Sequence, residues 1–269
     1  MEANFPTCCP MPGITFESNG RVDLAGSSFL IGVDSYRMIE VVSIDCFPGS
    51  ALDPNGRSVL SAELVFTPAE RAKIDKAIAA SESLAVTIPE PHVVTRNWMT
   101  DLAGAAPKPG HIWLDSAETV SDVLTSGLVS RRRDTPPYPT DSYRSEGDTH
   151  SKRPGERPEP GLTLQIKPEQ IRSEGHADRW RVTTLAGHEL VVSLLDCYVW
   201  DHRYDEVCQI LESATTQAMV ITLPPPIDSI DWIGSLVPGT LHAGYIWVNE
   251  QLTLNQLLVD RGIGSRIPF

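Results

Sequence analysis

Two segments share one pattern: Arg37-Met-Ile-Glu-Val-Val-Ser-Ile-Asp-Cys46 and His188-Glu-Leu-Val-Val-Ser-Leu-Leu-Asp-Cys197. Each is a run of β-forming residues that ends in Asp-Cys, as a buried strand ends on polar residues. The segments that follow the two runs also match one another, which indicates an internal duplication. The sequence therefore predicts two similar halves.

The first half is expected to be mainly strands with two helices. Strands are predicted over 14–17, 28–33, 37–46, 84–89 and 111–115. Thr67-Pro68-Ala69-Glu70 predicts the start of a helix, because a threonine cap, a proline in the first turn and a glutamate three residues on form a capping box. A shorter helix is expected over 119–128.

The second half repeats this order. Strands are predicted over 162–166, 179–184, 188–197, 219–224 and 245–249, and helices over 201–213 and 252–263. Equivalent positions lie 151 residues apart at the repeated strand and 135 or 134 apart later on. The shortening falls in the loop before the helix, where a change in length costs little.

Composition divides the chain into four parts. We expect a flexible tail over 1–12, one domain over 13–130, a disordered linker over 131–161 and a second domain over 162–269. The linker is rich in proline, serine, glycine and mixed charge, so it contains too few apolar residues to order itself. Length alone would allow one or two domains, and the duplication favours two.

Both halves are acidic. The 269-residue chain carries a net charge of −13, of which residues 15–130 hold −7 and residues 162–269 hold −6. An acidic surface opposes binding to a phosphate backbone, so we expect a protein partner rather than single-stranded nucleic acid. No apolar run is long enough to span a bilayer, so no membrane association is expected. The five cysteines fit neither a disulfide framework nor a zinc site, which favours free thiols in the cytoplasm.

The later segments carry a resemblance to a known family. Gly110-His-Ile-Trp-Leu-Asp115 is followed by residues 123–128, which match the end of that family's last helix, and Gly244-Tyr-Ile-Trp-Val-Asn249 is followed by a better match over 257–263. Each half resembles a staphylococcal-nuclease-like (thermonuclease) domain over nearly its whole length. The resemblance implies an α+β, mainly β fold of two tandem OB-fold barrels with appended helices.

The resemblance also implies phosphodiester hydrolysis. In that family two aspartates hold Ca²⁺, a glutamate helps to activate water, and two arginines stabilise the developing charge. Asp45 and Asp196 match the second metal aspartate, while the first would fall near Ser27 in the first half and near Asp178 in the second. The first arginine position holds Glu40 and Val191, the glutamate position Pro48 and Val199, and the second arginine position Pro107 and Leu241.

Too little of the catalytic set is kept for the family's reaction. Asp178 and Asp196 are the candidate metal ligands, for a weakly bound Ca²⁺, although each is better interpreted as an aspartate that caps a turn. No catalytic residue and no cofactor are assigned. The sequence favours a non-catalytic binding or scaffold protein. The alternative is a divergent Ca²⁺-dependent nuclease that works through the second half.

Three further groups were weighed as sites. Trp113 and Trp247 are either stacking platforms for bases or core residues, and the core interpretation is favoured. His176 with Asp178, and Asp201 with His202, are weak candidates for a metal site. Such neighbours are usually surface polar groups, so the sequence places no metal there.

Overall fold

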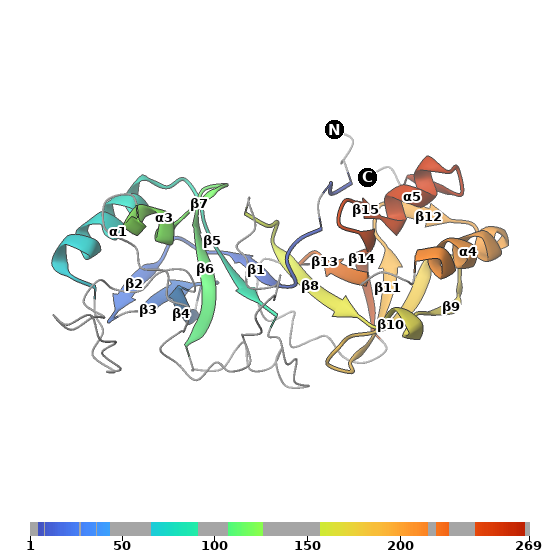
Figure 1. The fold of residues 1–269 in the computed structure, drawn as a ribbon, viewed down its shortest axis with the longest axis horizontal. Helices are drawn as coiled ribbons and strands as arrows, with labels where there is room; N and C mark the ends of the chain where they lie inside the picture. The colour runs from blue at the N-terminus through green and yellow to red at the C-terminus, as the bar shows by residue number, and fades with distance from the viewer. Residues whose placement is uncertain are drawn as a thin grey trace.

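The computed structural model describes residues 5–7, 9–26, 28–35, 37–43, 66–90, 107–125, 157–214, 219–225 and 240–266. The described chain is mostly strands with a few helices (Figure 1). The expected α+β, mainly β class is therefore confirmed.

The elements of the first half are β1 (Gly13–Glu17), β2 (Val22–Ala25), β3 (Ser28–Gly32), β4 (Met38–Ser43), α1 (Pro68–Ala80), β5 (Leu84–Pro89), β6 (Lys108–Leu114), β7 (Glu118–Thr119) and α3 (Val120–Thr125). Those of the second half are β8 (Gly161–Ile166), η4 (Pro168–Gln170), β9 (Arg172–His176), β10 (Arg179–Thr183), β11 (Glu189–Leu194), β12 (Cys197–Val199), η5 (Asp201–Arg203), α4 (Tyr204–Ala214), β13 (Met219–Leu223), β14 (Leu241–Asn249), β15 (Leu252–Thr253), α5 (Leu254–Asp260) and β16 (Gly264–Arg266).

The start of α1 confirms the predicted capping box. The Thr67 hydroxyl accepts from the Glu70 N–H at 3.2 Å, and the Glu70 carboxylate accepts from the Thr67 N–H at 2.7 Å. These two bonds satisfy amide donors that have no partner within the helix. On this helix Ile74 is buried, whereas Ala72 and Ala80 are exposed.

The strand order is the same in both halves. The first half runs β2-β3-β4-β6-β5-β1 and the second β9-β10-β11-β14-β13-β8. In each half one pair is parallel, β4 with β6 and β11 with β14, while the other neighbours on these two paths pair antiparallel. The duplication read from the sequence is therefore repeated in the sheet.

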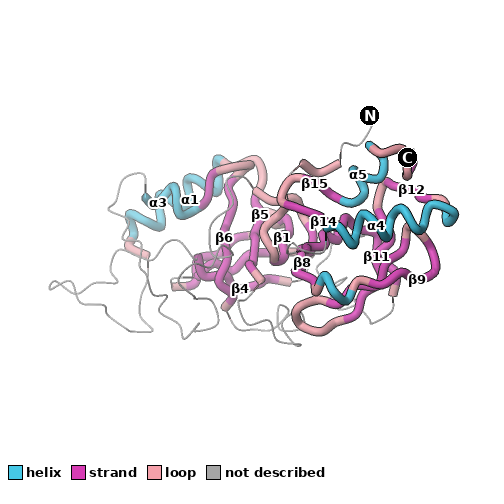
Figure 2. Tube along the Cα trace, turned by 45° about the vertical axis from the view of Figure 1, so that its right-hand side comes forward, coloured by secondary structure: helices cyan, strands magenta, loops and turns pink. Residues whose placement is uncertain are grey.

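One sheet runs through both halves because β1 pairs with β8. Gly13 lies opposite Thr163, Ile14 opposite Leu162 and Thr15 opposite Gly161. Gly13 and Gly161 are equivalent, so the register is two-fold symmetric about the Ile14–Leu162 pair. Figures 1 and 2 show β1 and β8 side by side between the two halves.

The path of this sheet is open among the described residues, with β2 and β9 at its ends. A closed barrel is not detected there. In both halves, however, the end of the first strand bonds to the end of the third. Asn19 N–H donates to Gly32 O at 3.0 Å, and Lys167 N–H donates to Thr183 O at 2.8 Å. An antiparallel bridge between Ile166 and Thr184 reinforces the second contact.

The two tryptophans weighed as stacking platforms are buried. Trp113 is 0% exposed and Trp247 is 1% exposed. Their indole N–H groups donate to Thr87 at 3.0 Å and to Thr222 at 2.9 Å. Each is therefore a packed residue with a satisfied polar group, and neither ring face is available to a base.

Several expectations fall partly or wholly outside the described residues. Asp45 and Cys46 lie there, as do residues 131–156 of the predicted linker. Arg157, near the end of that linker, contacts the first half: its backbone N–H donates to Ser116 O at 2.7 Å, and its side chain pairs with Glu17. The division into two domains stays a prediction. No helix among the described residues is long and apolar enough to cross a membrane.

Glu90 connects the two halves just after β5. Its side chain is 3% exposed, and one carboxylate oxygen accepts from the backbone N–H of Gln165 in β8 at 3.2 Å. The other oxygen, Oε1, is buried without a hydrogen-bond partner. Burial raises the pKa of Glu90 from 4.5 to about 7, because a charged carboxylate loses its hydration there, and hydrogen bonding by Gln165 only partly opposes this rise.

We predict that Glu90 makes the protein less stable as the pH rises. A carboxyl whose pKa is raised by folding contributes full stability below its unfolded pKa, and this is lost as the pH passes the folded value. From pH 4.5 to 8 the Glu90→Gln variant should gain roughly 2–3 kcal/mol of unfolding free energy relative to wild type. Urea unfolding at a series of pH values measures this difference, with exposed Glu118→Gln as control. A constant difference across that range would contradict the prediction.

Candidate functional site

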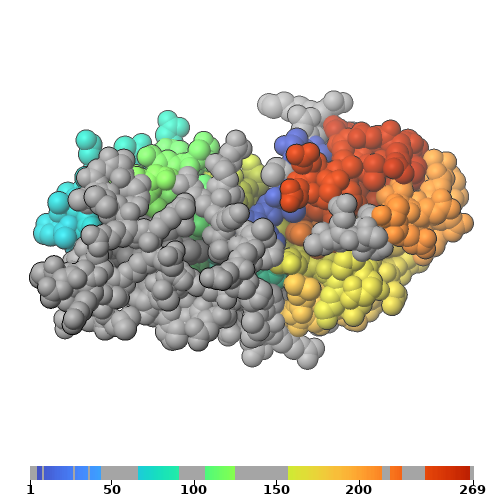
Figure 3. All heavy atoms as spheres, viewed as in Figure 1, coloured from blue at the N-terminus to red at the C-terminus, as the bar shows by residue number. Residues whose placement is uncertain are grey.

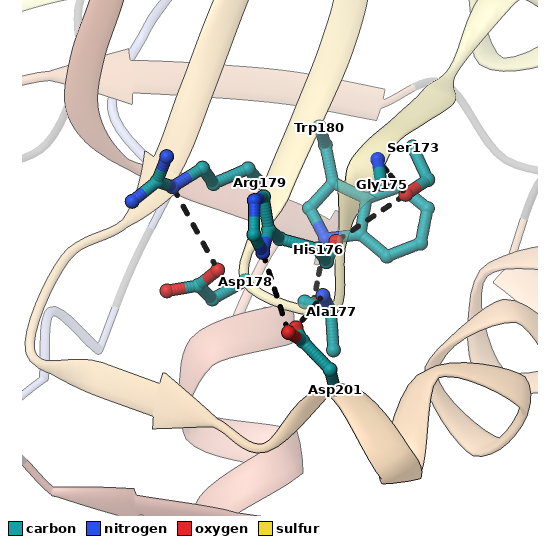
Figure 4. Close-up of polar contacts among 8 residues, drawn as sticks. All are labelled: Ser173, Gly175, His176, Ala177, Asp178, Arg179, Trp180 and Asp201. Carbon is teal, nitrogen blue, oxygen red and sulfur yellow. Dashed lines mark hydrogen bonds and ion pairs between the residues drawn. The ribbon is translucent and has the colours of Figure 1, made fainter.

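The predicted metal ligands lie at one end of the second half. Asp178 occupies the turn between β9 and β10, and Asp196 the turn between β11 and β12. The two turns are tied together, since Leu194 N–H, at the end of β11, donates to Asp178 O at 3.0 Å. Figure 4 shows the β9–β10 turn with its polar contacts. We refer to these two turns, with η5 beside them, as the aspartate end of the second half.

Asp178 faces a cation of its own chain. Its carboxylate lies 4.0 Å from the Arg179 guanidinium, and its side chain is 19% exposed (Figure 4). Its negative charge also acts on the buried thiol of Cys197. Burial first, and the Asp178 charge second, raise the pKa of Cys197 to about 12. This thiol therefore stays protonated at neutral pH and is a poor nucleophile or metal ligand.

Asp196 is fixed by a different partner. Its backbone has φ of 59°, the left-handed conformation that aspartate tolerates better than most residues. The Tyr245 hydroxyl in β14 donates to its carboxylate at 2.7 Å. Burial and this carboxylate together raise the pKa of Tyr245 well above its usual value. Asp196 therefore ends a strand in a tight turn and accepts a hydrogen bond, which fits the turn interpretation.

The structure brings together one pair that the sequence left apart. Asp201, at the start of η5, accepts from the Ala177 N–H at 3.2 Å and lies 3.4 Å from Nδ1 of His176 (Figure 4). The Ala177 N–H is the main cause that lowers the pKa of Asp201, with His176 a smaller one. This carboxylate therefore holds the β9–β10 turn against η5, which is a structural role.

These side chains do not fit a Ca²⁺ site. Calcium takes six to eight oxygen ligands, and several carboxylates usually supply them. Here Asp196 accepts from a tyrosine, Asp178 lies beside an arginine, and Asp201 is bonded to backbone. Within the described part of the chain, no three His, Cys, Asp or Glu side chains are grouped so that they could hold a metal ion.

The other positions of the second half that the resemblance assigns to catalysis carry no charge. Val191, at the first arginine position, is buried in β11 with 7% exposure, and Val199, at the glutamate position, is buried in β12 with 1% exposure. Leu241, at the second arginine position, is exposed at the start of β14. No cation from these positions can therefore reach a phosphate.

The first half is described only in part at the same positions. Glu40 in β4 accepts a hydrogen bond from the Ser28 hydroxyl, so a carboxylate stands where the family has an arginine. Pro107 is exposed and uncharged. Ser27, Asp45 and Pro48 lie outside the described residues.

Sequence reasoning missed an exposed aromatic pair. Tyr198 in β12 is 39% exposed and Trp200, just after it, is 57% exposed. Their rings meet edge to face with centroids 4.9 Å apart. Cys197 and Val199, which alternate with these two aromatic residues, are buried. The alternation of apolar and aromatic residues in Cys-Tyr-Val-Trp is therefore the sequence signal that could have placed Tyr198 and Trp200 on the exposed face. Large aromatic side chains exposed as a pair are typical of interaction surfaces.

Comparison with known proteins adds no family assignment. The sequence matches no protein-family model, and no curated protein matches it. The resemblance to thermonuclease-like domains therefore stays a prediction from the sequence.

We predict that the Tyr245–Asp196 bond contributes measurably to stability. Tyr245→Phe removes the hydroxyl donor and leaves the half-buried Asp196 carboxylate without this hydrogen bond. The free energy of unfolding should therefore fall by about 1–2 kcal/mol. Urea unfolding at neutral pH measures this change. Tyr198→Phe is the matched control, because its ring is exposed. Equal stability of the two variants would show that the bond is not formed in solution.

Proposed function

We propose that this chain is a non-catalytic binding or scaffold protein built from two degenerate staphylococcal-nuclease-like OB-fold domains. The observation that most strongly supports the non-catalytic role is that Val191 and Val199 are buried where that family has its first arginine and its glutamate. A buried valine can be neither a cation nor a proton acceptor. Rearrangement of a loop would not restore these groups, because both residues lie within strands.

The topology supports the OB-fold part of this proposal. In each half the path of six strands starts and ends on strands that are consecutive in the chain, β1 and β2 or β8 and β9. The bonds from Asn19 to Gly32 and from Lys167 to Thr183 bring the end of the first strand against the third. A single parallel contact among otherwise antiparallel strands, β4 with β6 in the first half and β11 with β14 in the second, is compatible with the partly open Greek-key barrel of the OB-fold.

The chemistry supports the non-catalytic part. Hydrolysis of a phosphodiester requires cations around the developing charge, and the loss of one well-placed donor typically costs about 100–1000-fold in rate. In the second half both arginine positions are aliphatic. In the first half Glu40 places a carboxylate at the equivalent position. Because fold does not imply activity, the likeness in strand order is no argument for catalysis.

The binding part is supported by Tyr198 and Trp200, which expose aromatic surface at the aspartate end of the second half. The net charge of −6 over residues 162–269 opposes a phosphate backbone there and favours a protein partner over single-stranded nucleic acid. A reducing cytoplasm fits the free thiols of Cys9, Cys197 and Cys208.

We predict no nuclease activity of the kind typical of the family. Purified full-length protein should leave single-stranded DNA and RNA intact over hours, with or without millimolar Ca²⁺, because the required cations are absent. Gel analysis of labelled substrates measures this, with an Asp196→Ala variant as control. Strong Ca²⁺-dependent cleavage that disappears in that variant would overturn the proposal and establish the enzyme. Cleavage that survives it would indicate a contaminant.

We predict that the aromatic pair carries partner binding. In affinity capture from the source cell, Trp200→Ala and Tyr198→Ala should each reduce retention of a specific protein at least about tenfold, as for aromatic hot spots at interfaces. Leu185→Ala is the matched control, since Leu185 is also an exposed large apolar residue of the second half. This assignment would be contradicted if the Leu185→Ala control lost as much of the captured protein. It would also be contradicted if the captured material were nucleic acid that nuclease treatment releases.

A further inference from the structure

The N-terminal tail lies against the second half, although the first half follows it in the chain. In Figure 3 the first described residues lie against the C-terminal part of the molecule. Cys9 N–H donates to Glu250 O, in the turn between β14 and β15, at 2.8 Å. Phe5, four residues earlier, is only 5% exposed.

Phe5 is held by two side chains. The Arg266 guanidinium lies over its ring at 4.7 Å from the centroid, a cation–π contact. The Tyr245 ring meets it edge to face, with centroids 6.5 Å apart and an angle of 81°. The Tyr245 hydroxyl is in turn bonded to Asp196. We call Tyr245 and Arg266, with Asp196 behind Tyr245, the Phe5 site.

The second half builds this site without help from the tail. Arg266 is held in β16 opposite Cys197 of β12, and Tyr245 is held in β14 opposite Thr222 of β13. The tail, in contrast, has no helix or strand over residues 5–7 and 9–12. A segment attached to a rigid surface by an aromatic anchor and a backbone hydrogen bond belongs to the part of a protein that opens most easily. Site and occupant are therefore separable.

We propose that the Phe5 site is a docking site for an aromatic side chain on an extended segment, and that the tail occupies it in cis. This occupation of the site by the tail adds regulation to the binding role proposed above. A partner that presents an aromatic residue in an extended segment would compete with Phe5 and displace the tail. Arg266 and the Tyr245 ring select an aromatic ring through its face and edge, where an aliphatic side chain gains less.

Competition in cis has a measurable consequence. A short tether gives the tail an effective concentration on the order of millimolar at its own site, so any external segment must outcompete it. Removal of the Phe5 ring should open the site to the same segment added in solution. Loss of Arg266 should weaken both the internal and the external contact.

The test uses the full-length protein and a synthetic peptide of residues 3–12 with Cys8→Ser and Cys9→Ser. Titration followed by NMR should show binding to the Phe5→Ala variant at least about tenfold tighter than to wild type, because the internal competitor is weakened. A peptide that also carries Phe5→Ala should not bind. Arg266→Gln combined with Phe5→Ala should lose the peptide, whereas Trp200→Ala combined with Phe5→Ala should retain it.

Hydrogen exchange supplies a second readout that needs no added ligand. Amides of residues 245–249 and 264–266 should exchange faster in the Phe5→Ala and Arg266→Gln variants than in wild type, with Trp200→Ala unchanged. No peptide binding together with unchanged exchange would overturn the proposal and leave Phe5 as ordinary packing. Such a failure would leave the non-catalytic role intact, while nuclease activity would remove that role and leave the tail contact untouched.

Discussion

The antiparallel pairing of β1 with β8 is the contact through which one sheet passes from the first half to the second. The pairing of β1 with β8 depends on two glycines. A Cβ on Gly13 would lie 2.3 Å from Ile88 O, and one on Gly161 would lie 2.8 Å from Leu223 O. Their φ values of 148° and 153° are also unfavourable for other residues. Only glycine therefore allows β5 and β13 to approach the central pair from either side.

The sequence predicted the elements whose information is local. The capping box from Thr67 to Glu70 marks the start of α1 because all of its partners lie within four residues. The apolar run over 84–89 is buried along its whole length, and it forms β5 with the predicted bounds. The polar edge strand β9 was missed, because Arg172–His176 has neither an apolar run nor an apolar alternation.

The candidate site could be predicted only in part, for the same physical reason. Asp178 and Asp196 were interpreted as turn residues from their positions at the ends of predicted strands. Their partners were not, because Tyr245 is 49 residues from Asp196 and is brought to it by the pairing of distant strands. Phe5 lies still farther from Arg266, and a lone phenylalanine in a proline-rich tail has no periodic pattern. Contacts of this kind are set by tertiary structure, which single-sequence patterns do not contain.

The central pair also has a consequence for how the chain is made. During synthesis β1 and its partner β5 emerge early, whereas β8 begins only at Gly161. At about 5–20 residues per second, the ribosome leaves one edge of β1 uncovered for roughly 7–30 s. An unpaired strand edge is a template for association with other chains. We therefore expect the nascent first half to be most open to association with other chains until β8 emerges and pairs with β1.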